Sequence, residues 1–584
     1  MKINKNYFWA DIFINCLLDA DVQYAVISPG SRNTSLTLAA VDNEQLETLS
    51  VIDERGAGFF ALGLARSINK PVALICTSGT ATAEYYPAII EAYQQRIPLI
   101  VCTADRPGHL VDTGANQTIR QSNIYKNHIR FFADCGLPSL KQNSIKTYKN
   151  KISKGLLTAL YDDRGPVHFN FPFEKPFEPH STTDDIDINT FSGIADERLE
   201  GFETDDLQEG HVPAATLKKI EKALAKSKNP LVLVGPGDFD DDFYPMVNEF
   251  ARRYNAVIFG DAASGIRFTK KTLSHVIVNY DTLLRFETLP ANVSPDVIII
   301  FGRTMTSVMV EKLLETSSDF RVVINTFGDR FDPSDGNRLI INRKSKSFLL
   351  DMLALPSKGK AEKAGNLLSY MKKKDAAIEK RKRKYISVNG KISEAELVNT
   401  IIGALPDKST LMLGNSLPIR DYDNFASPVK KDIAVKQNRG ASGIDGITAT
   451  ALGLAYANKQ KSFLVTGDVA FYYDINSLLI GKKYSIPLII FVMNNNGGRI
   501  FDMLPVAQYG EACKEFFVTP LDIDFKPLVQ GFGGIFHSVK TRAALASAIQ
   551  KSLSAKSLSV IEIVVDADYS AKKRTEMRRY ISGD

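Results

Sequence analysis

The chain has 584 residues, which is too long for one hydrophobic core, so we expect three or four domains. Hydrophobic residues make up 44% and charged residues 24% of the sequence, as in ordinary soluble globular proteins. The net charge of +6 is small for this length and gives no reason to expect a nucleic-acid partner. Two basic runs, 372–384 and 572–579, are interrupted at helical spacing by acidic or apolar residues, which is typical of solvated helix faces.

The number and spacing of the cysteines and the length of the apolar runs indicate where in the cell the protein is expected to lie. The five cysteines are odd in number, far apart and without metal-site spacing, which favours a reduced, cytoplasmic protein. No apolar run approaches the roughly 20 residues needed to span a bilayer. Because Asp11, Asn15 and Asp19 interrupt the apolar face of the first segment, we expect neither a signal peptide nor membrane insertion.

Strand-like apolar runs alternate with amphipathic helical stretches along almost the whole chain. Such a pattern indicates parallel sheets covered on both faces, so we expect an α/β protein made of doubly wound parallel-sheet domains. Polar stretches at 178–212 and 356–365 are the expected linkers, which gives domains at 1–185, 213–355 and 366–584. The clearest strand-like runs are 24–30, 71–79, 97–104, 230–237, 296–302, 462–468 and 486–495. Small and polar residues gather at the ends of these runs, where ligands bind in open α/β sheets.

Glu54 is the first residue with a possible chemical role. It follows an expected strand, Leu49–Ile52, and precedes a helix rich in Gly and Ala. A glutamate in an apolar setting has a pKa raised by desolvation, which suits proton transfer. The alternative is an exposed glutamate that interacts with the helix dipole, and from these residues alone this alternative is the stronger interpretation.

The middle segment offers a competing hypothesis. Gly235–Pro236–Gly237 follows a strand and could form the turn of a non-catalytic nucleotide-binding protein, although one such turn is a weak signal. Arg303 directly follows Gly302 at the end of a later strand, where ligands bind. The alternative for Arg303 is an ordinary surface arginine.

Residues 463–501 carry the most informative pattern. One strand is expected to end at Gly467–Asp468, a helix is expected over 474–484, and a second strand is expected to end at Asn494–Asn496, followed by Gly497. A carboxylate, an amide oxygen and a backbone carbonyl that can approach a ligand closely form the oxygen set that Mg²⁺ uses together with phosphate groups. The alternative is that these are only turn residues after strands.

Several short motifs together resemble one enzyme family. Residues 463–501 are similar to the thiamine diphosphate motif, which begins Gly-Asp-Gly and ends in Asn-Asn, with Val469 departing from the second Gly. The chain as a whole resembles the 2-succinyl-5-enolpyruvyl-6-hydroxy-3-cyclohexene-1-carboxylate (SEPHCHC) synthase family over both outer domains. The motifs that carry this likeness are ISPGSRNTSL (27–36), DERGAG (53–58), TSGTAT (77–82), ADRP (104–107), NQTIRQ (116–121), GNSLPIR (414–420) and NRGASGIDG (438–446).

The resemblance implies a pyrimidine-binding domain, a central domain and a diphosphate-binding domain, in that order. It implies thiamine diphosphate and Mg²⁺, or Mn²⁺, as cofactors, with Asp468, Asn495 and the carbonyl of Gly497 as metal ligands. Active sites of the family lie between subunits, so a homodimer or a homotetramer is expected.

The other site residues also follow from the resemblance. Four arginines, expected in turns after strands, would bind the carboxylates of two dianionic substrates, because guanidinium groups fit carboxylates bidentately. Ser416 with Arg420 would hold the succinyl carboxylate, and Arg32 with Arg106 the isochorismate. The implied catalytic residues are Glu54, Ser31, Asn116 and Gln117, the substrate-binding residues are Arg32, Arg106, Ser416, Arg420 and Arg439, and the cofactor contacts besides the metal ligands are Glu54, Thr80, Ile444 and Phe501.

The implied activity is that of a transferase of menaquinone biosynthesis. It decarboxylates 2-oxoglutarate and adds the resulting succinyl carbanion equivalent to isochorismate by 1,4-addition, giving SEPHCHC and CO₂. One alternative is another thiamine-dependent 2-oxoacid decarboxylase or carboligase, which would not need four arginines. One departure concerns isochorismate: many members carry a Lys after a Ser where this chain has Val308 after Ser307. Arg303 is the best-placed substitute for that charge, ahead of Lys312.

Overall fold

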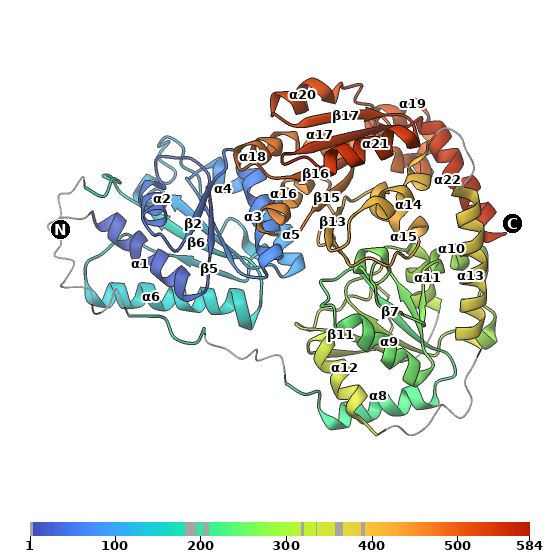
Figure 1. The fold of residues 1–584 in the computed structure, drawn as a ribbon. Helices are drawn as coiled ribbons and strands as arrows, with labels where there is room; N and C mark the ends of the chain where they lie inside the picture. Colours follow the sequence, from blue (N-terminus) through green and yellow to red (C-terminus); the bar gives the residue numbers. More distant parts are fainter. Residues whose placement is uncertain are drawn as a thin grey trace. The chain divides into compact units, whose positions relative to one another are not determined.

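The computed structural model describes residues 4–180, 193, 197–202, 210–316, 320–334, 336–356, 366–386, 392–458 and 460–583. Most of the first expected linker and nearly all of the second lie outside the described residues. The described residues form three six-stranded sheets, and one lies in each of the three expected sequence ranges (Figure 1). The expected α/β class with parallel sheets is therefore confirmed.

Close packing divides the chain into two compact units. The first unit comprises 1–206, 438–459 and 472–488. Its sheet has the order β2-β1-β3-β4-β6-β5 with parallel pairing throughout. Its strands are β1 (Tyr24–Ile27), β2 (Glu47–Ser50), β3 (Val72–Cys76), β4 (Leu99–Asp105), β5 (Phe131–Asp134) and β6 (Val167–Pro172). Its main helices are α1 (Lys5–Asp19), α2 (Thr34–Val41), α3 (Glu54–Ile68), α4 (Thr80–Glu84), α5 (Tyr86–Gln95), α6 (Gln142–Leu157), α16 (Ile447–Ala457) and α18 (Leu478–Lys483).

The second unit comprises 207–437, 460–471 and 489–584 and holds the other two sheets. The first of these has the order β12-β11-β10-β7-β8-β9. Its strands are β7 (Pro230–Val234), β8 (Val257–Gly260), β9 (Val276–Ile277), β10 (Val297–Phe301), β11 (Phe320–Asn325) and β12 (Arg338–Asn342). Its helices are α8 (Ala214–Lys226), α9 (Phe243–Tyr254), α10 (Tyr280–Phe286), α11 (Val308–Thr316), α12 (Ser345–Ala354) and α13 (Leu367–Ile386). Alternate residues of β7 enter two separate hydrophobic cores, so both faces of this sheet are covered, as its apolar strands predict.

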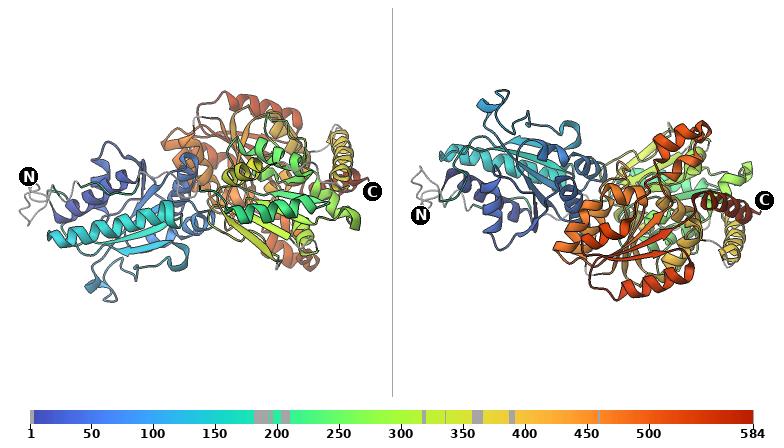
Figure 2. Two further views of the ribbon diagram at one scale, coloured as in Figure 1. Left: turned by 90° about the horizontal axis from the view of Figure 1, so that it is seen from below. Right: turned by 90° about the horizontal axis from the view of Figure 1, so that it is seen from above.

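The third sheet has the order β14-β13-β15-β16-β18-β17. Its strands are β13 (Ser409–Leu413), β14 (Ile433–Gln437), β15 (Ser462–Gly467), β16 (Leu488–Asn494), β17 (Ile535–Val539) and β18 (Ser559–Val564). The neighbouring helices in the sequence are α14 (Glu394–Ala404), α15 (Leu417–Phe425), α17 (Asp468–Tyr473), α20 (Phe525–Gly531), α21 (Arg542–Leu553) and α22 (Ala567–Ser582). The final helix, α22, lies beside α13 (Figures 1 and 2).

Two predicted element boundaries are wrong. The strand before Glu54 ends at Ser50 rather than at Ile52. The helix expected over 474–484 begins six residues earlier, as α17, and is interrupted at Asp474 before α18. At the interruption, the buried Asp474 carboxylate accepts hydrogen bonds from the nearby Ser477 hydroxyl and from the backbone N–H of Ala449, 25 residues earlier. Those bonds draw the chain out of the helix.

The interpretation of the basic runs as solvated faces is also wrong in part. Lys382, on α13, is fully buried and pairs with Glu379 at 2.8 Å. Arg574, on α22, is 2% exposed and pairs with two carboxylates. Each run therefore contributes one buried cation to an internal ion pair. The spacing of charges in the sequence does not distinguish this cation from its exposed neighbours.

Among the described residues, no helix has both the length and the apolar character needed to cross a membrane. All five cysteines are free and buried, in agreement with a role as small apolar residues.

Helices α3 and α16 cross at very short range within the first unit. A Cβ built on Gly63 would lie 2.2 Å from the carbonyl oxygen of Thr450, and one on Gly453 would lie 2.2 Å from that of Phe60. Only hydrogen fits between these backbones, so the small residues of α3 serve close helix packing, as their abundance predicts.

Gly63→Ala should lower the thermal unfolding midpoint by several degrees. A methyl group gains about 0.5–1 kcal/mol of helix propensity, but forcing two backbones apart costs about 1–3 kcal/mol. Gly403→Ala, in α14, is the matched control, because its Cβ would meet nothing within 4 Å. Scanning calorimetry of both variants checks this, and an equal or higher midpoint for Gly63→Ala would show that the crossing is loosely packed.

Candidate active site

A cluster of oxygen atoms lies at the carboxyl ends of two neighbouring strands of the third sheet. Asp468 is the first residue after β15, and Asn495 and Gly497 follow β16, its neighbour in the sheet. The Asp468 carboxylate accepts a hydrogen bond from the backbone N–H of Gly497 at 2.7 Å. The two strand ends are thereby tied together, and Asp468 and Asn495 are both buried.

The donor set suits a hard divalent cation. Asn495 Oδ1 is buried and has no hydrogen-bond partner, whereas its Nδ2 donates to Glu394. Burial raises the pKa of Asp468 to about 6, as expected for a carboxylate whose charge is not neutralised. A buried amide oxygen without a donor and a desolvated carboxylate are both stabilised when a cation lies between them.

Backbone geometry explains the glycine and the departure at Val469. Gly497 has φ = 128°, and a Cβ there would lie 2.5 Å from the Val518 carbonyl oxygen, so no other residue fits. Val469 is the second residue of α17 and therefore has helical backbone that any residue adopts. The family pattern's second glycine is thus not needed for this chain conformation.

The other two asparagines of the run have structural contacts. Asn494 donates to Glu562 at 2.8 Å, and Asn496 Oδ1 accepts from the backbone N–H groups of Leu521 and Asp522 at 3.0 Å each. Of the three, only Asn495 presents an oxygen without a donor.

Glu54 is the first residue of α3 and is partly buried. Burial raises its pKa, and the neighbouring Asp53 and Glu84 carboxylates act in the same direction. Asp53 caps the helix by accepting from the Gly56 N–H at 3.3 Å. Glu54 is therefore half-buried at the first turn of α3, and desolvation favours its protonated form.

Thr80 is the first residue of α4, and the loop that precedes it is bonded to the loop that carries Gln117. The Gln117 side chain donates to the Ser78 carbonyl at 3.1 Å, and the Gly79 N–H donates to the side chain of Gln121 at 3.0 Å. Gln117 has φ = 56°. Gln121 is buried and was not singled out from the sequence, although it ends the NQTIRQ motif.

Arg32 and Arg106 lie close to each other at strand ends of the first sheet. Burial and then the neighbouring Arg106 guanidinium lower the pKa of Arg32. Arg32 donates to the Phe173 carbonyl at 2.6 Å, whereas Nη1 of Arg106 is buried without a hydrogen-bond partner. Two adjacent guanidinium groups, one with an unused donor, favour an anionic ligand.

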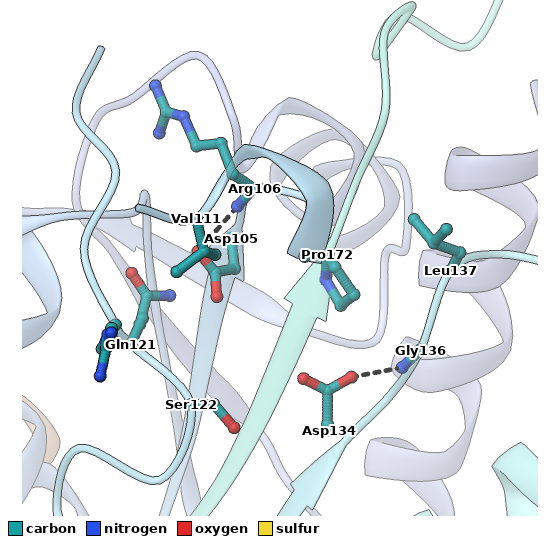
Figure 3. A pocket seen from close by; sticks show the side chains of 11 residues that line it. Asp105, Arg106, Val111, Gln121, Ser122, Asp134, Gly136, Leu137 and Pro172 are labelled. Carbon is teal, nitrogen blue, oxygen red and sulfur yellow. Dashed lines mark hydrogen bonds between the residues drawn. The ribbon is translucent and has the colours of Figure 1, made fainter. Parts of the chain in front are cut away.

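A cavity of about 540 Å³ opens beside Arg106 at the ends of β4, β5 and β6 (Figure 3). Asp105, whose carboxylate accepts from the Arg106 N–H at 2.7 Å, and Asp134 line it. Arg120 also lines it and pairs bidentately with Asp112 at 2.7–3.1 Å. The sequence analysis did not identify Arg120, because only Asn116 and Gln117 of the NQTIRQ motif were predicted to be site residues.

Arg439 and Ile444 belong to a loop that is anchored in the first unit. The Glu91 carboxylate, on α5, accepts from the backbone N–H groups of Gly440 and Ala441 at 2.8 and 2.6 Å. Arg439 and Ile444 flank this anchored segment and are themselves partly exposed. No sequence signal pointed to Glu91, which has the pattern of an ordinary helix glutamate.

The prediction that Arg420 lies in a turn is wrong. It lies within α15, and its Nη1 donates to the carbonyl of Ser416, at the N-terminus of the same helix, at 2.7 Å. The expected pair is therefore in contact, but through a local i, i−4 bond. Ser416 itself has φ = 70°.

Arg303, Val308 and Phe501 lie at other positions of the second unit. Arg303 follows β10, as expected, and its guanidinium lies 4.6 Å from the centre of the Phe331 ring. Val308 is 52% exposed. Phe501 packs edge-on against Phe517 at 5.4 Å. Ser31 and Asn116 are exposed loop residues.

The Gly-Pro-Gly turn has a packing explanation. A Cβ on Gly235 would lie 1.9 Å from the Arg303 carbonyl oxygen, and one on Gly302 would lie 2.7 Å from the Gly235 carbonyl oxygen. Gly235 and Gly302 let the ends of β7 and β10 approach, which accounts for Gly235 without a nucleotide.

Comparison with known proteins identifies the family of the chain. Residues 9–124 match the N-terminal and residues 437–563 the C-terminal TPP-binding domain of thiamine pyrophosphate enzymes. A SEPHCHC synthase of Bacillus cytotoxicus is 32% identical over 99% of this chain and 98% of its own length. One of Listeria monocytogenes is 35% identical over 94% and 93%, and one of Geobacillus thermodenitrificans is 34% identical over 99% and 96%.

The chain belongs to the SEPHCHC synthase family. It also carries the N-terminal and C-terminal TPP-binding domains of thiamine pyrophosphate enzymes, and together these findings confirm the resemblance drawn from its motifs. Solved structures show the fold. A thiamine diphosphate-dependent 4-hydroxybenzoylformate decarboxylase of Rhodococcus jostii aligns with a TM-score of 0.68 at 15% identity, covering 96% of this chain and 99% of that one. A benzoylformate decarboxylase of Polynucleobacter necessarius gives 0.68 at 17%, covering 96% and 98%.

Gly497→Ala should weaken thiamine diphosphate binding in the presence of Mg²⁺ about tenfold or more. The methyl group would need the loop to move away from Val518, and strain at a positive φ costs on the order of 1–3 kcal/mol. Gly531→Ala, where a Cβ meets nothing within 4 Å, is the control. Isothermal titration calorimetry checks this. Equal affinities for the two variants would mean that this loop does not shape the cofactor site.

Proposed function

We propose that this SEPHCHC synthase family member decarboxylates 2-oxoglutarate and adds the remaining four-carbon unit to isochorismate, giving SEPHCHC and CO₂ in menaquinone biosynthesis. The observation that carries the proposal is the set of oxygen atoms at the carboxyl ends of β15 and β16, which suits a metal ion that binds a diphosphate. The same chain also holds two neighbouring guanidinium groups, those of Arg32 and Arg106. The named relatives support the choice of substrates, since they are SEPHCHC synthases and this chain matches them over nearly their full length.

Mg²⁺, or Mn²⁺ in its place, would be held by Asp468, Asn495 Oδ1 and the carbonyl of Gly497. Thiamine diphosphate, when bound, supplies the carbon nucleophile that 2-oxoacid decarboxylation requires. Thr80, Ile444 and Phe501 are proposed as its further contacts. The anchoring of the Ile444 loop by Glu91 supports a fixed rather than a mobile contact at that position.

The arginines are proposed to divide between the two substrates. Arg32 and Arg106 would bind isochorismate, because Arg106 has an unused buried donor and a cavity beside it. Ser416 and Arg420 would bind the succinyl carboxylate of 2-oxoglutarate, with Arg439 near the cofactor loop. Ser31, Asn116 and Gln117 would orient the reacting groups and hold protons. Arg303 is retained as the proposed substitute for the lysine absent at Val308.

The assembly and the domain roles are proposals too. We assign pyrimidine binding to 1–185, a central role to 213–355 and diphosphate binding to 366–584. The active form would be a cytoplasmic homodimer or homotetramer with active sites between subunits.

The experiment that tests this function is product identification. The protein is incubated with 2-oxoglutarate, isochorismate, thiamine diphosphate and Mg²⁺, and the products are analysed by mass spectrometry. Formation of SEPHCHC only when both substrates are present supports the proposal. Turnover of pyruvate alone, without SEPHCHC from the pair, would instead identify another thiamine-dependent decarboxylase or carboligase.

Glu54→Gln should lower kcat by at least about a hundredfold, the low end of general acid–base contributions. The amide keeps the shape of the side chain but cannot share a proton with the cofactor's aminopyrimidine ring. Steady-state kinetics, with calorimetry to show that the cofactor still binds, check this. Glu44→Gln, at an exposed position of the same unit, is the control. Near-parent activity of Glu54→Gln would remove the residue from the mechanism.

A further inference from the structure

The amide of Asn495 has two ends with opposite chemistry. Oδ1 is buried without a partner, and Nδ2 donates to Oε1 of Glu394. The two ends of an asparagine amide are nearly equal in size, so packing alone does not select one orientation. Only the orientation that presents Oδ1 can serve a cation, because the reversed amide would point an NH₂ group at it.

Glu394 supplies that selection. It is the first residue of α14, it is buried, and its carboxylate accepts hydrogen bonds from Asn495, Ser570 and Arg574. Nδ2 of Asn495 therefore faces it. In the reversed orientation, Oδ1 of Asn495 would meet a carboxylate oxygen, which leaves two acceptors in contact at a buried position and is costly.

The last helix of the chain holds Glu394 in place. Oε2 of Glu394 accepts from the Ser570 hydroxyl and from Nη2 of Arg574 at 2.9 Å. Arg574 also binds Asp421 bidentately, at 2.8 Å from both Nε and Nη2. Glu394, Asp421, Ser570 and Arg574 are all buried. Arg574 of α22 thus joins α14 to α15, the helix that carries Arg420.

We propose that Glu394 is a positioning residue that fixes the Asn495 amide with Oδ1 toward the metal, and that α22, through Ser570 and Arg574, is part of the cofactor site. The proposal rests on the Mg²⁺–thiamine diphosphate function proposed above. Hydrogen-bond partners of metal ligands commonly set metal affinity by 10–100-fold, which fixes the size of the expected effect.

Glu394→Gln tests the proposal in the full-length protein. Because Ser570 and the Arg574 cation donate to Oε2, the glutamine keeps its carbonyl oxygen on that side and turns its NH₂ group toward Asn495, which favours the reversed Asn495 amide with Oδ1 facing residue 394. We expect Mg²⁺ affinity, titrated calorimetrically at saturating thiamine diphosphate, to fall at least about tenfold. Glu396→Gln is the control, because Glu396 is a buried glutamate of the same helix that bonds Ser393 instead.

A second substitution separates positioning from general support. In Asn495→Asp both ends of the side chain are oxygen, so no orientation needs to be selected, and the amide introduced by Glu394→Gln can donate to it. The double variant Glu394→Gln/Asn495→Asp should recover Mg²⁺ affinity to within about threefold of the parent, whereas a merely structural Glu394 would leave the Glu394→Gln loss in place.

The outcomes are distinguishable. If the parent protein binds thiamine diphosphate without any dependence on Mg²⁺, the proposed function fails and the inference fails with it. If the parent depends on Mg²⁺ but Glu394→Gln binds it within twofold, or weakens no more than Glu396→Gln does, only the inference is overturned. Should Glu394→Gln not fold, Ser570→Ala replaces it, since it keeps the carboxylate and removes one of its donors. A threefold or greater loss of Mg²⁺ affinity then supports the proposal, and an unchanged affinity overturns it.

Discussion

The site depends on one constraint, the adjacency of β15 and β16 in the third sheet. Because neighbouring strands end together, Asp468 and Asn495 arrive at the same edge although 27 residues separate them in sequence. The hydrogen bond from the Gly497 N–H to Asp468 then holds the two strand ends together, and the backbone there fits only glycine. What remains is a buried amide oxygen and a desolvated carboxylate that a divalent cation would satisfy.

The sequence predicted the parts that depend on local pattern. Apolar strands ending in polar residues indicated the sheet class and the meeting of Asp468 and Asn495 at one sheet edge, because both follow from the period of the chain and from where a strand stops. Prediction failed where side chains at a distance decide. Asp474 interrupts a helix where the backbone N–H of Ala449, 25 residues earlier, bonds its carboxylate, and this partner lies outside a local window. Arg420 lies in a helix rather than a turn, although its partner Ser416 is only four residues away.

The supporting residues were missed for the same reason. Glu394 and Glu91 have the pattern of ordinary helix glutamates, yet one faces Asn495 and the other anchors the loop between Arg439 and Ile444. Arg574 belongs to a basic run with the pattern of a solvated face but is buried against Asp421. In each case a charged side chain is buried with its partner, and only the tertiary structure shows which charges those are.

The most direct test of the metal–diphosphate site is anomalous scattering from a crystal of the protein grown with thiamine diphosphate and Mn²⁺. We predict a single strong anomalous peak within coordination distance of the Asp468 carboxylate, Asn495 Oδ1 and the Gly497 carbonyl, bridged to the diphosphate. A peak bound elsewhere, or a bound cofactor with Asn495 Nδ2 turned toward its diphosphate, would contradict this assignment of the metal ligands.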